Sequence, residues 1–229
     1  MRRLTGLSFL IAIATFAILT PAGASGTHDG YHRYSQADEV TGVSFTGARV
    51  VRIDRSVTQV PNDGCGGPYQ GHPTYLTMWV MDDAAMNWRE LGTGHQCAGN
   101  LKYWFWGYGL NGAWFSVGTQ GGVVTGVNRS FQIRHGFDGS TTRTYYDISG
   151  TTKGSIQSSR TFDLVRVGLE SYAQGSNMVK TNFGSLQYQM NLGALQSWVG
   201  RDGRRVDVGF CGGWTADTTW GNVGKGAGC

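Results

Sequence analysis

The sequence has little charge, little proline and few of the apolar patterns that predict helices. Charged residues make up 15% of the 229-residue chain, and only four residues are proline. Glycine, with 37 residues, and aromatic residues, at 12%, are abundant instead. Many glycines and aromatics without a long 3.6-residue apolar period are typical of short strands joined by tight turns. We therefore predict an all-β fold, a two-sheet antiparallel β-sandwich.

Several chemistries lack their sequence signatures. No run of Lys and Arg is longer than two residues, whereas a nucleic-acid-binding protein normally shows a concentrated basic stripe. The chain has no CxxC or HExxH motif for a metal and no GxSxG motif for a nucleophilic serine. We expect no nucleic-acid partner, no bound metal and no cofactor.

The N-terminal segment has the pattern of a secretory signal peptide. Arg2 and Arg3 precede an apolar run over residues 7–19, and the segment 22–24 (AGA) supplies the small residues of a cleavage site. The run is short for a bilayer span, and no second apolar segment follows it. We expect removal of residues 1–24, and one secreted, extracellular domain over residues 25–229, a monomer without a membrane span.

The four cysteines are an even number in a chain predicted to be exported, which argues for two disulfides. Four cysteines allow three pairings. We favour Cys65 with Cys97, which would tie the proline-containing loop over residues 61–73 to a sheet. The remaining pair, Cys211 with Cys229, would fix the glycine-rich C-terminal tail.

Three dipeptides carry the strongest short-range signal for a hairpin turn, because each lies between segments rich in β-branched and aromatic residues. They are Asn111-Gly112, Asp138-Gly139 and Asp202-Gly203. We expect a hairpin at each.

The segment KYWFWGYGLNGAWF concentrates aromatic residues. As a strand it carries Trp104, Trp106 and Tyr108 on one face and Tyr103 and Phe105 on the other. Two interpretations stay open. In the first, all of these rings fill the core. In the second, the tryptophan row forms a platform for sugar rings or extended peptides.

Alternation also assigns faces in the segment SRTFDLVRVGLESYA. Val165, Val167 and Leu169 share the apolar face of this strand, and Arg166, Glu170 and Tyr172 the polar one. We expect the apolar face to pack inward and the polar face to point outward.

The segment RSFQIRHGF alternates in the same way. Its apolar face carries Phe131, Ile133 and Phe137, and His135 falls among them. We interpret His135 as a histidine of the core or its edge with satisfied hydrogen bonds, and not as a general base.

Most acidic residues lie beside turn residues, where a side chain can bond to nearby backbone, but Glu90 and Glu170 do not. Each lies in an expected strand, on the same side as a large aromatic residue, Trp88 and Tyr172 respectively. Two carboxyl groups brought together on a desolvated face share a proton, which raises one pKa and suits general acid–base hydrolysis. The alternative is structural, with each carboxylate paired to a nearby arginine, Arg89 or Arg166.

Three motifs follow one another along the chain: WRELG, KYWFWGY and VGLESYAQGSNMVKTNFGSLQY. In this order they resemble the glutamic peptidases with a concanavalin-like jelly roll, the fungal eqolisins, and more distantly the plant neprosins. The resemblance covers about Tyr75 to Tyr188. It implies a jelly-roll fold for the sandwich.

The resemblance also implies site residues. Glu90 takes the position of the eqolisin glutamine and Glu170 that of a glutamate, as in neprosins, which use two glutamates. Arg166 and Phe105 stand where eqolisins have acids. The implied activity is that of a glutamic endopeptidase, in which one carboxylate activates water while its partner, or an amide such as Gln187, stabilises the oxyanion. An extracellular polypeptide would then contact the expected binding residues Trp88, Trp104, Trp106, Tyr108, Arg166, Tyr172 and Gln187.

Two other functions stay open. A non-catalytic carbohydrate-binding (lectin-like) or cell-surface adhesion domain would use Trp104, Trp106 and Tyr108 to bind a polysaccharide. A glycoside hydrolase would use the same carboxyl pair, but jelly-roll glucanases carry an ExDxE run that this sequence lacks.

Overall fold

The computed structural model describes residues 33–39, 44–53, 57–59, 74–82, 84–96, 101–172, 176–199 and 201–229. The expected signal peptide over residues 1–24, the loop over residues 61–73 and the expected pair Cys65 and Cys97 lie outside the described residues. They remain predictions, as does the single-domain boundary.

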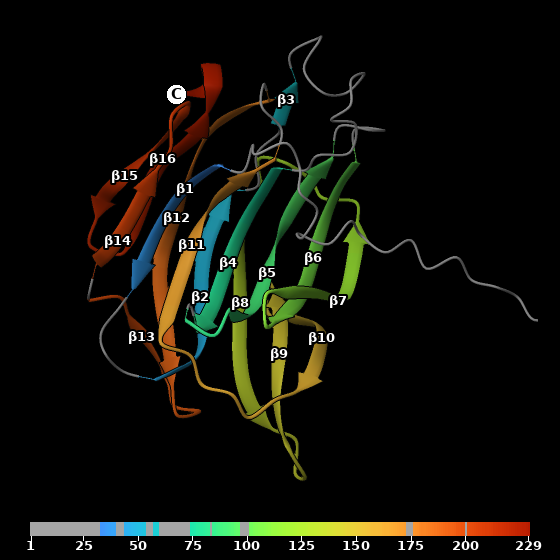
Figure 1. Ribbon diagram of the computed structural model, residues 1–229. Coiled ribbons are helices and arrows are strands. Elements are labelled where there is room, and N and C mark those ends of the chain that lie inside the picture. Colours follow the sequence, from blue (N-terminus) through green and yellow to red (C-terminus); the bar gives the residue numbers. More distant parts are fainter. Residues whose placement is uncertain are drawn as a thin grey trace, which may run out of the picture.

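Two antiparallel sheets stacked face to face make up the described chain (Figure 1). Sheet A has the strand order β14 (Arg201–Val206), β1 (Arg33–Glu39), β11 (Leu164–Ser171), β4 (Thr74–Asp82), β5 (Asn87–Gln96), β6 (Leu101–Leu110) and β7 (Ala113–Gly121). Sheet B has the order β10 (Thr151–Gln157), β9 (Thr142–Ile148), β8 (Asn128–Phe137), β2 (Phe45–Ile53), β12 (Ser176–Met190), β16 (Thr219–Lys225) and β15 (Phe210–Ala216), with β13 (Leu195–Ser197) and β3 (Val57–Gln59) paired to β12.

The short 3-10 helix η2 (Gly226–Gly228) is the only helix among these residues. The predicted all-β, two-sheet antiparallel sandwich is therefore confirmed. In the part of the chain that the structure describes, no helix is long and apolar enough to cross a membrane.

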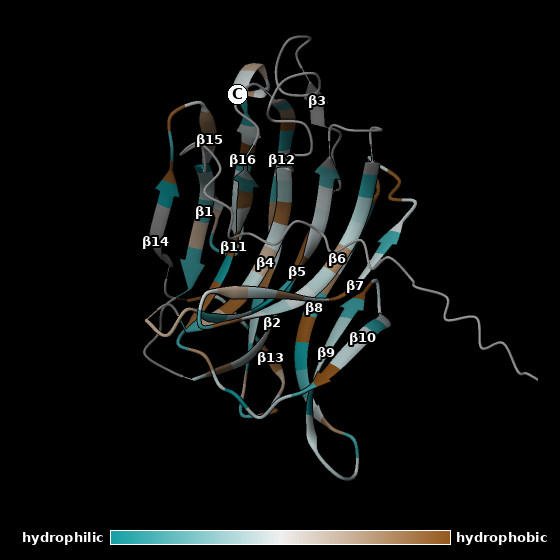
Figure 2. Ribbon diagram, turned by 45° about the vertical axis from the view of Figure 1, so that its right-hand side comes forward, coloured by the Kyte–Doolittle hydropathy of each residue, from teal (hydrophilic) through white to brown (hydrophobic). Residues whose placement is uncertain are grey.

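Hydrophobic and hydrophilic residues follow one another along the strands (Figure 2). Because successive side chains point to opposite faces, the hydrophobic ones gather between the two sheets and form the core. Val165, Val167 and Leu169 of β11 are fully buried in it, as are Phe131 and Ile133 of β8. These predictions from alternation are confirmed.

Phe137 does not belong to the core, although it shares the face of Phe131 and Ile133. Its side chain is 64% exposed, because it ends β8 next to the hairpin turn, where β8 and β9 extend past sheet A (Figure 1). The prediction for this residue was wrong.

Two of the three expected hairpins are present. Asn111 and Gly112 have φ angles of 50° and 80° and join β6 to β7, the left-handed conformation that this dipeptide favours. Asp138 begins the turn between β8 and β9, where its Oδ1 accepts hydrogen bonds from the backbone N–H groups of Ser140 at 3.0 Å and Thr141 at 2.9 Å.

The expected turn at Asp202-Gly203 is wrong. Both residues lie inside β14, which pairs with β1 and places Asp202 opposite Asp38. The turn comes later, at residues 208–209, because pairing with β1 keeps the backbone extended through Val206.

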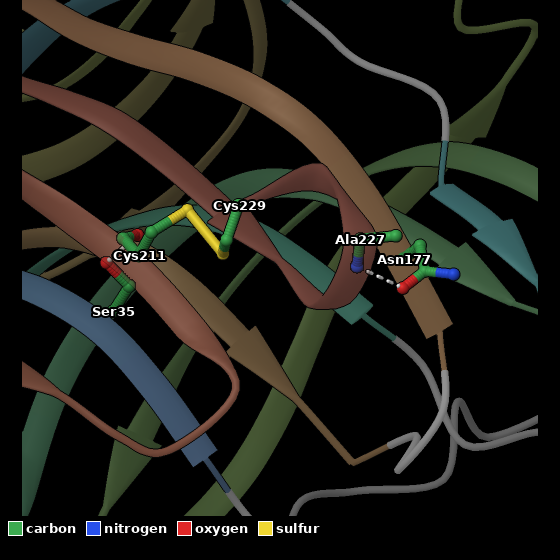
Figure 3. Close-up of a disulfide and its surroundings, with 5 residues drawn as sticks. All are labelled: Ser35, Asn177, Cys211, Ala227 and Cys229. Carbon is green, nitrogen blue, oxygen red and sulfur yellow. Dashed lines mark hydrogen bonds between the residues drawn. A yellow bond between two sulfur atoms is a disulfide. The ribbon is translucent and has the colours of Figure 1, made fainter.

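A disulfide joins Cys211 of β15 to Cys229, the pairing that we favoured for the tail (Figure 3). The backbone N–H of Ala227 donates a hydrogen bond to Oδ1 of Asn177 at 2.8 Å. On the other side, Ser35 Oγ of β1 donates to the carbonyl of Cys211 at 2.8 Å. Around the disulfide, the tail is therefore held to β12, and β15 is held to β1 of sheet A.

Arg52 of β2 is buried between the sheets. Its Nη2 donates hydrogen bonds to the carbonyl of Leu76 at 3.1 Å and to Oγ1 of Thr93 at 2.6 Å. Its guanidinium lies 3.9 Å from the ring centroid of Phe131. Arg52 thus links sheet B to the two central strands β4 and β5 of sheet A.

Candidate functional site

The face of sheet A that points away from sheet B holds a cavity of about 210 Å³. Side chains of β1, β11, β4, β5, β6 and β7 reach it, so that it lies across most of the sheet. Eight aromatic residues line it: Tyr34, Tyr75, Trp79, Trp88, Tyr103, Phe105, Trp114 and Tyr172. Glu90 and Glu170 line the same cavity.

Strand register explains why the two glutamates face one way. Glu170 of β11 lies opposite Tyr75 of β4, and Glu90 of β5 lies opposite Trp79 of β4. Tyr75 and Trp79 are an even number of residues apart, so their side chains point to the same face. Because strands are about 4.8 Å apart, Glu90 and Glu170 stand on strands about 10 Å apart, on either side of β4.

The row between the glutamates consists of small residues. Gly168 of β11 lies opposite Thr77 of β4, and Thr77 lies opposite Gly92 of β5. Because Gly168 and Gly92 have no side chain, Gln36 and the Phe105 ring can lie over the sheet beside them, 2.9 Å from where each Cβ would stand, and line the cavity. The hollow between Glu170 and Glu90 therefore depends on register and glycine placement.

Aromatic rings lie against glycines of the neighbouring strands on this face. A Cβ atom at Gly94 would come within 2.5 Å of the Tyr103 ring, and one at Gly92 within 2.9 Å of the Phe105 ring. The ring of Trp114 similarly covers Gly107, at 2.6 Å from where a Cβ would stand. Glycine in a strand interior often marks such a close approach. These glycines allow the rings to lie along the sheet and form the cavity wall.

Glu90 is 7% exposed. Its Oε1 accepts a hydrogen bond from Oγ1 of Thr77 at 2.9 Å, and its Oε2 accepts one from Nε1 of Trp88 at 3.2 Å. Burial, and next the charge of Glu170, raise the pKa of Glu90 to about 8, although the hydrogen bonds from Thr77 and Trp88 lower it. Glu90 therefore carries a proton in neutral and acidic solution.

Glu170 is 8% exposed and has a different set of neighbours. The hydroxyl of Tyr172 donates a hydrogen bond to its Oε1 at 2.8 Å, and Tyr34 of β1 lies opposite it across the ladder. Burial and the charge of Glu170 raise the pKa of both Tyr172 and Tyr34. These phenols remain protonated, so the Tyr172 hydroxyl remains a hydrogen-bond donor to Glu170.

The structure brings five of the expected site residues into one cavity. Glu90, Glu170, Trp88, Arg166 and Tyr172 all line it. Within each strand, these side chains share a face because successive residues point to opposite sides of the sheet, a rule that can be applied to the sequence alone.

Four expected binding residues lie elsewhere. Trp104 and Trp106 are 9% and 7% exposed and belong to the core. Glu90 lies opposite Gly107, so the odd-numbered residues of β6 share the cavity face with Glu90. The even-numbered tryptophans therefore point to the other face, toward sheet B. Tyr108 shares the inner face and stacks on Phe115 with a centroid distance of 5.1 Å. Gln187 lies in β12 of sheet B, opposite Arg49 of β2. Of the two interpretations of the tryptophan row, the structure therefore favours the core.

The arginines that offered a structural explanation for the glutamates have other partners. Arg166 forms a two-pronged ion pair with Asp38, with Nε–Oδ1 at 2.7 Å and Nη2–Oδ2 at 2.8 Å. Arg89 points to the opposite face of β5, where its Nη2 donates to Oγ of Ser158 at 2.8 Å.

His135 is buried between the sheets, on the far side of sheet A from the cavity. Burial, and next the charge of Arg89, lower the pKa of His135 to about 4. Its Nε2 has no hydrogen-bond partner among the described residues. The interpretation as a core histidine is confirmed.

Sequence reasoning missed the contribution of β1 to the cavity. Tyr34 and Gln36 line it, and Asp38 holds the cavity residue Arg166. The alternating pattern of RYSQADE carries these three residues on one face, so the strand itself could have been recognised. Its position beside β11 could not.

Within the described residues, no group of three or more His, Cys, Asp or Glu side chains is placed to hold a metal ion. The polar groups at the cavity are two carboxyl groups, hydroxyl groups, indole N–H groups, the Arg166 guanidinium and one glutamine amide. This set can transfer protons and bind polar groups.

No protein-family model matches the sequence, and no curated protein sequence matches it. The fold is similar to that of SCP-B, a member of the eqolisin family of peptidases, solved in a complex with the tripeptide Ala-Ile-His. The TM-score is 0.54 at 9% sequence identity, over 82% of this chain and 96% of that chain. This likeness shows a shared fold and supports the predicted concanavalin-like jelly roll.

Two other solved structures are less similar. A β-glucanase from Bacillus licheniformis gives a TM-score of 0.42 at 9% identity, over 74% of this chain and 91% of that chain. The carbohydrate-binding module CBM66 from Bacillus subtilis gives 0.32 at 13% identity, over 73% of this chain and 88% of that chain.

Proposed function

We propose that the protein is a secreted hydrolase that cleaves polypeptides with the carboxyl pair Glu90 and Glu170. The observation that carries this proposal is that two strands on either side of β4 deliver these groups to one cavity. The two carboxyl groups have unlike surroundings, which is the arrangement that divides acid and base roles.

The surroundings of each carboxyl group support one division of the acid and base roles. Glu90 carries a proton because burial raises its pKa to about 8, so it acts as the general acid. Glu170 accepts a hydrogen bond from Tyr172 and acts as the general base. Glu170 takes a proton from water while the water oxygen bonds to the carbonyl carbon of the substrate. The C–N bond then breaks, and the proton of Glu90 passes to the amine nitrogen.

The products are a carboxylic acid and an amine. The proton held by Glu170 then passes to Glu90, directly or through solvent, and restores the starting state. The cavity is smaller than the roughly 300–1,000 Å³ of most ligand sites, so we expect it to enclose one or two residues of an extended substrate. The likeness of the fold to that of a peptidase, and the order of the three sequence motifs, favour a polypeptide over other substrates.

A second candidate function rests on the flat rings. Tyr103, Phe105 and Trp114 lie against glycines and line the cavity, an arrangement that also suits the apolar faces of sugar rings. A non-catalytic carbohydrate-binding domain would use these residues in place of Trp104, Trp106 and Tyr108.

Protein cleavage between pH 2 and pH 8 tests the proposal, with casein as substrate. We expect Glu90→Gln and Glu170→Gln each to reduce cleavage by at least about 100-fold. Glu39→Gln is the matched control, because Glu39 is buried away from the cavity, where it accepts a hydrogen bond from the backbone of Val199. Binding to a glycan array without any casein cleavage would favour the second function.

A further inference from the structure

Gln36 of β1 is a polar residue of the cavity that the acid–base scheme does not use. Its side chain lines the cavity and is 6% exposed. Within the described residues its side-chain amide makes no hydrogen bond. Buried amides are normally satisfied by protein, water or ligand, so an amide that points into a cavity is placed to bind something there.

The register places Gln36 beside Glu170. Tyr34 lies opposite Glu170, and Gln36, two residues later, lies opposite Gly168. A Cβ atom at Gly168 would come within 2.9 Å of the Gln36 Cβ atom. The glycine therefore leaves the Gln36 side chain room at the edge of the hollow between the two glutamates.

Three other donors near the two glutamates have acceptors. Trp88 donates to Glu90, Tyr172 donates to Glu170, and Arg166 donates to Asp38. The side-chain N–H groups of Gln36 are not used by these contacts and can donate to a substrate carbonyl on the Glu170 side.

We propose that Gln36 is a further catalytic residue, whose Nε2 donates a hydrogen bond to the carbonyl oxygen of the scissile peptide bond. This inference rests on the proposed function. When the water oxygen bonds to the carbonyl carbon, the electron pair of the C=O π bond moves to oxygen, and Gln36 stabilises the resulting negative charge. When the C–N bond breaks, this pair re-forms the C=O bond and the proton of Glu90 passes to nitrogen. This is the role that the sequence had suggested for Gln187, which lies in sheet B.

A donor of this kind acts mainly in the transition state, since charge on the oxygen develops only there. Its loss therefore lowers kcat more than it changes KM. Gln36→Met removes the donor and keeps the length of an unbranched side chain. Gln187→Met is the matched control.

The experiment measures kcat and KM for hydrolysis of one peptide substrate by the wild type and both variants, with melting curves as a check of folding. We expect kcat of Gln36→Met to fall by about 100-fold or more with little change in KM, and Gln187→Met to behave as the wild type. An equal effect of the two substitutions, or a change confined to KM, would overturn the role of Gln36 while leaving the peptidase in place. A wild type without hydrolytic activity would overturn the proposed function, and the inference with it.

Gln36→Glu keeps the inference testable if Gln36→Met does not fold. A carboxylic acid can donate a hydrogen bond, whereas a carboxylate cannot. We expect Gln36→Glu to lose activity near neutral pH and to recover part of it in acid, relative to the wild-type profile. A profile that matches the wild type at every pH would overturn the proposed hydrogen bond.

Discussion

The hydroxyl of Tyr172 donates a hydrogen bond to Oε1 of Glu170 at 2.8 Å. The two residues are two positions apart, which places both side chains on the cavity face of β11. Glu90 has different donors, Thr77 and Trp88, and carries a raised pKa. The two carboxyl groups of the cavity therefore have different surroundings, and the roles proposed for them rest on this difference.

Tyr172→Phe removes the donor to Glu170 and leaves the ring in place. Because this hydrogen bond goes to the proposed base, we expect kcat/KM to fall when it is lost. Loss of a hydrogen bond to a charged group is worth about 1.5–3 kcal/mol, or roughly 10-fold or more in rate. Measurement of kcat/KM for the wild type and the variant checks this. An unchanged kcat/KM would contradict the assignment of Glu170 as the base.

Glu90 should make the folded protein less stable as pH rises. Its pKa is about 8 in the folded state and near the ordinary 4.5 when unfolded, so between these pH values the folded state binds more protons. Its free energy of unfolding then decreases with pH, by up to about 1.4 kcal/mol for each pH unit. Urea denaturation at pH 5 and pH 8 should show this decrease in the wild type and a smaller one in Glu90→Gln. Equal decreases in both proteins would contradict the raised pKa.

Trp88 and Trp104 are both tryptophans of sheet A, but they should respond differently to substitution by phenylalanine. Trp88→Phe removes a hydrogen bond that lowers the pKa of Glu90, so we expect the basic limb of the pH–rate profile to move to higher pH. Trp104→Phe shortens a core side chain and should lower the melting temperature without moving that limb. Identical pH profiles for the two variants would show that Trp88 does not act on Glu90.

The faces of β11 could be predicted from the sequence, because the alternation of apolar and polar residues is a local pattern. Val167 and Leu169 are in the core and Glu170 is on the outer face, as the pattern required. The placement of β1 beside β11 joins residues such as Asp38 and Arg166, which are 128 positions apart. No local pattern specifies that pairing, so the contribution of Gln36 was missed.

The face of β6 could not be chosen from the sequence for another reason. Both faces of this strand are aromatic, so alternation alone does not say whether Trp104 or Phe105 points to the cavity. The choice follows from pairing with β5, where Phe105 lies opposite Gly92 on the face of Glu90. Glycines inside β5 and β6 were the sequence signal that could have indicated the side on which rings approach the backbone.

Gly92 offers the sharpest test of how the cavity is built. A Cβ atom at this position would stand 2.5 Å from the carbonyl oxygen of Leu76 and 2.9 Å from the Phe105 ring. We expect Gly92→Ala to push this ring from its place, to destabilise the protein by about 1–3 kcal/mol and to reduce substrate cleavage.

Gly121→Ala is the matched control for that substitution, because Gly121 also lies in a strand of sheet A but has nothing within 4 Å of an added Cβ atom. Its effect on stability should stay within about 0.5 kcal/mol. Urea denaturation of both variants, with cleavage measured on the same samples, makes the comparison. If Gly92→Ala were as harmless as Gly121→Ala, the ring of Phe105 would not depend on the missing side chain, and the cavity wall would need another explanation.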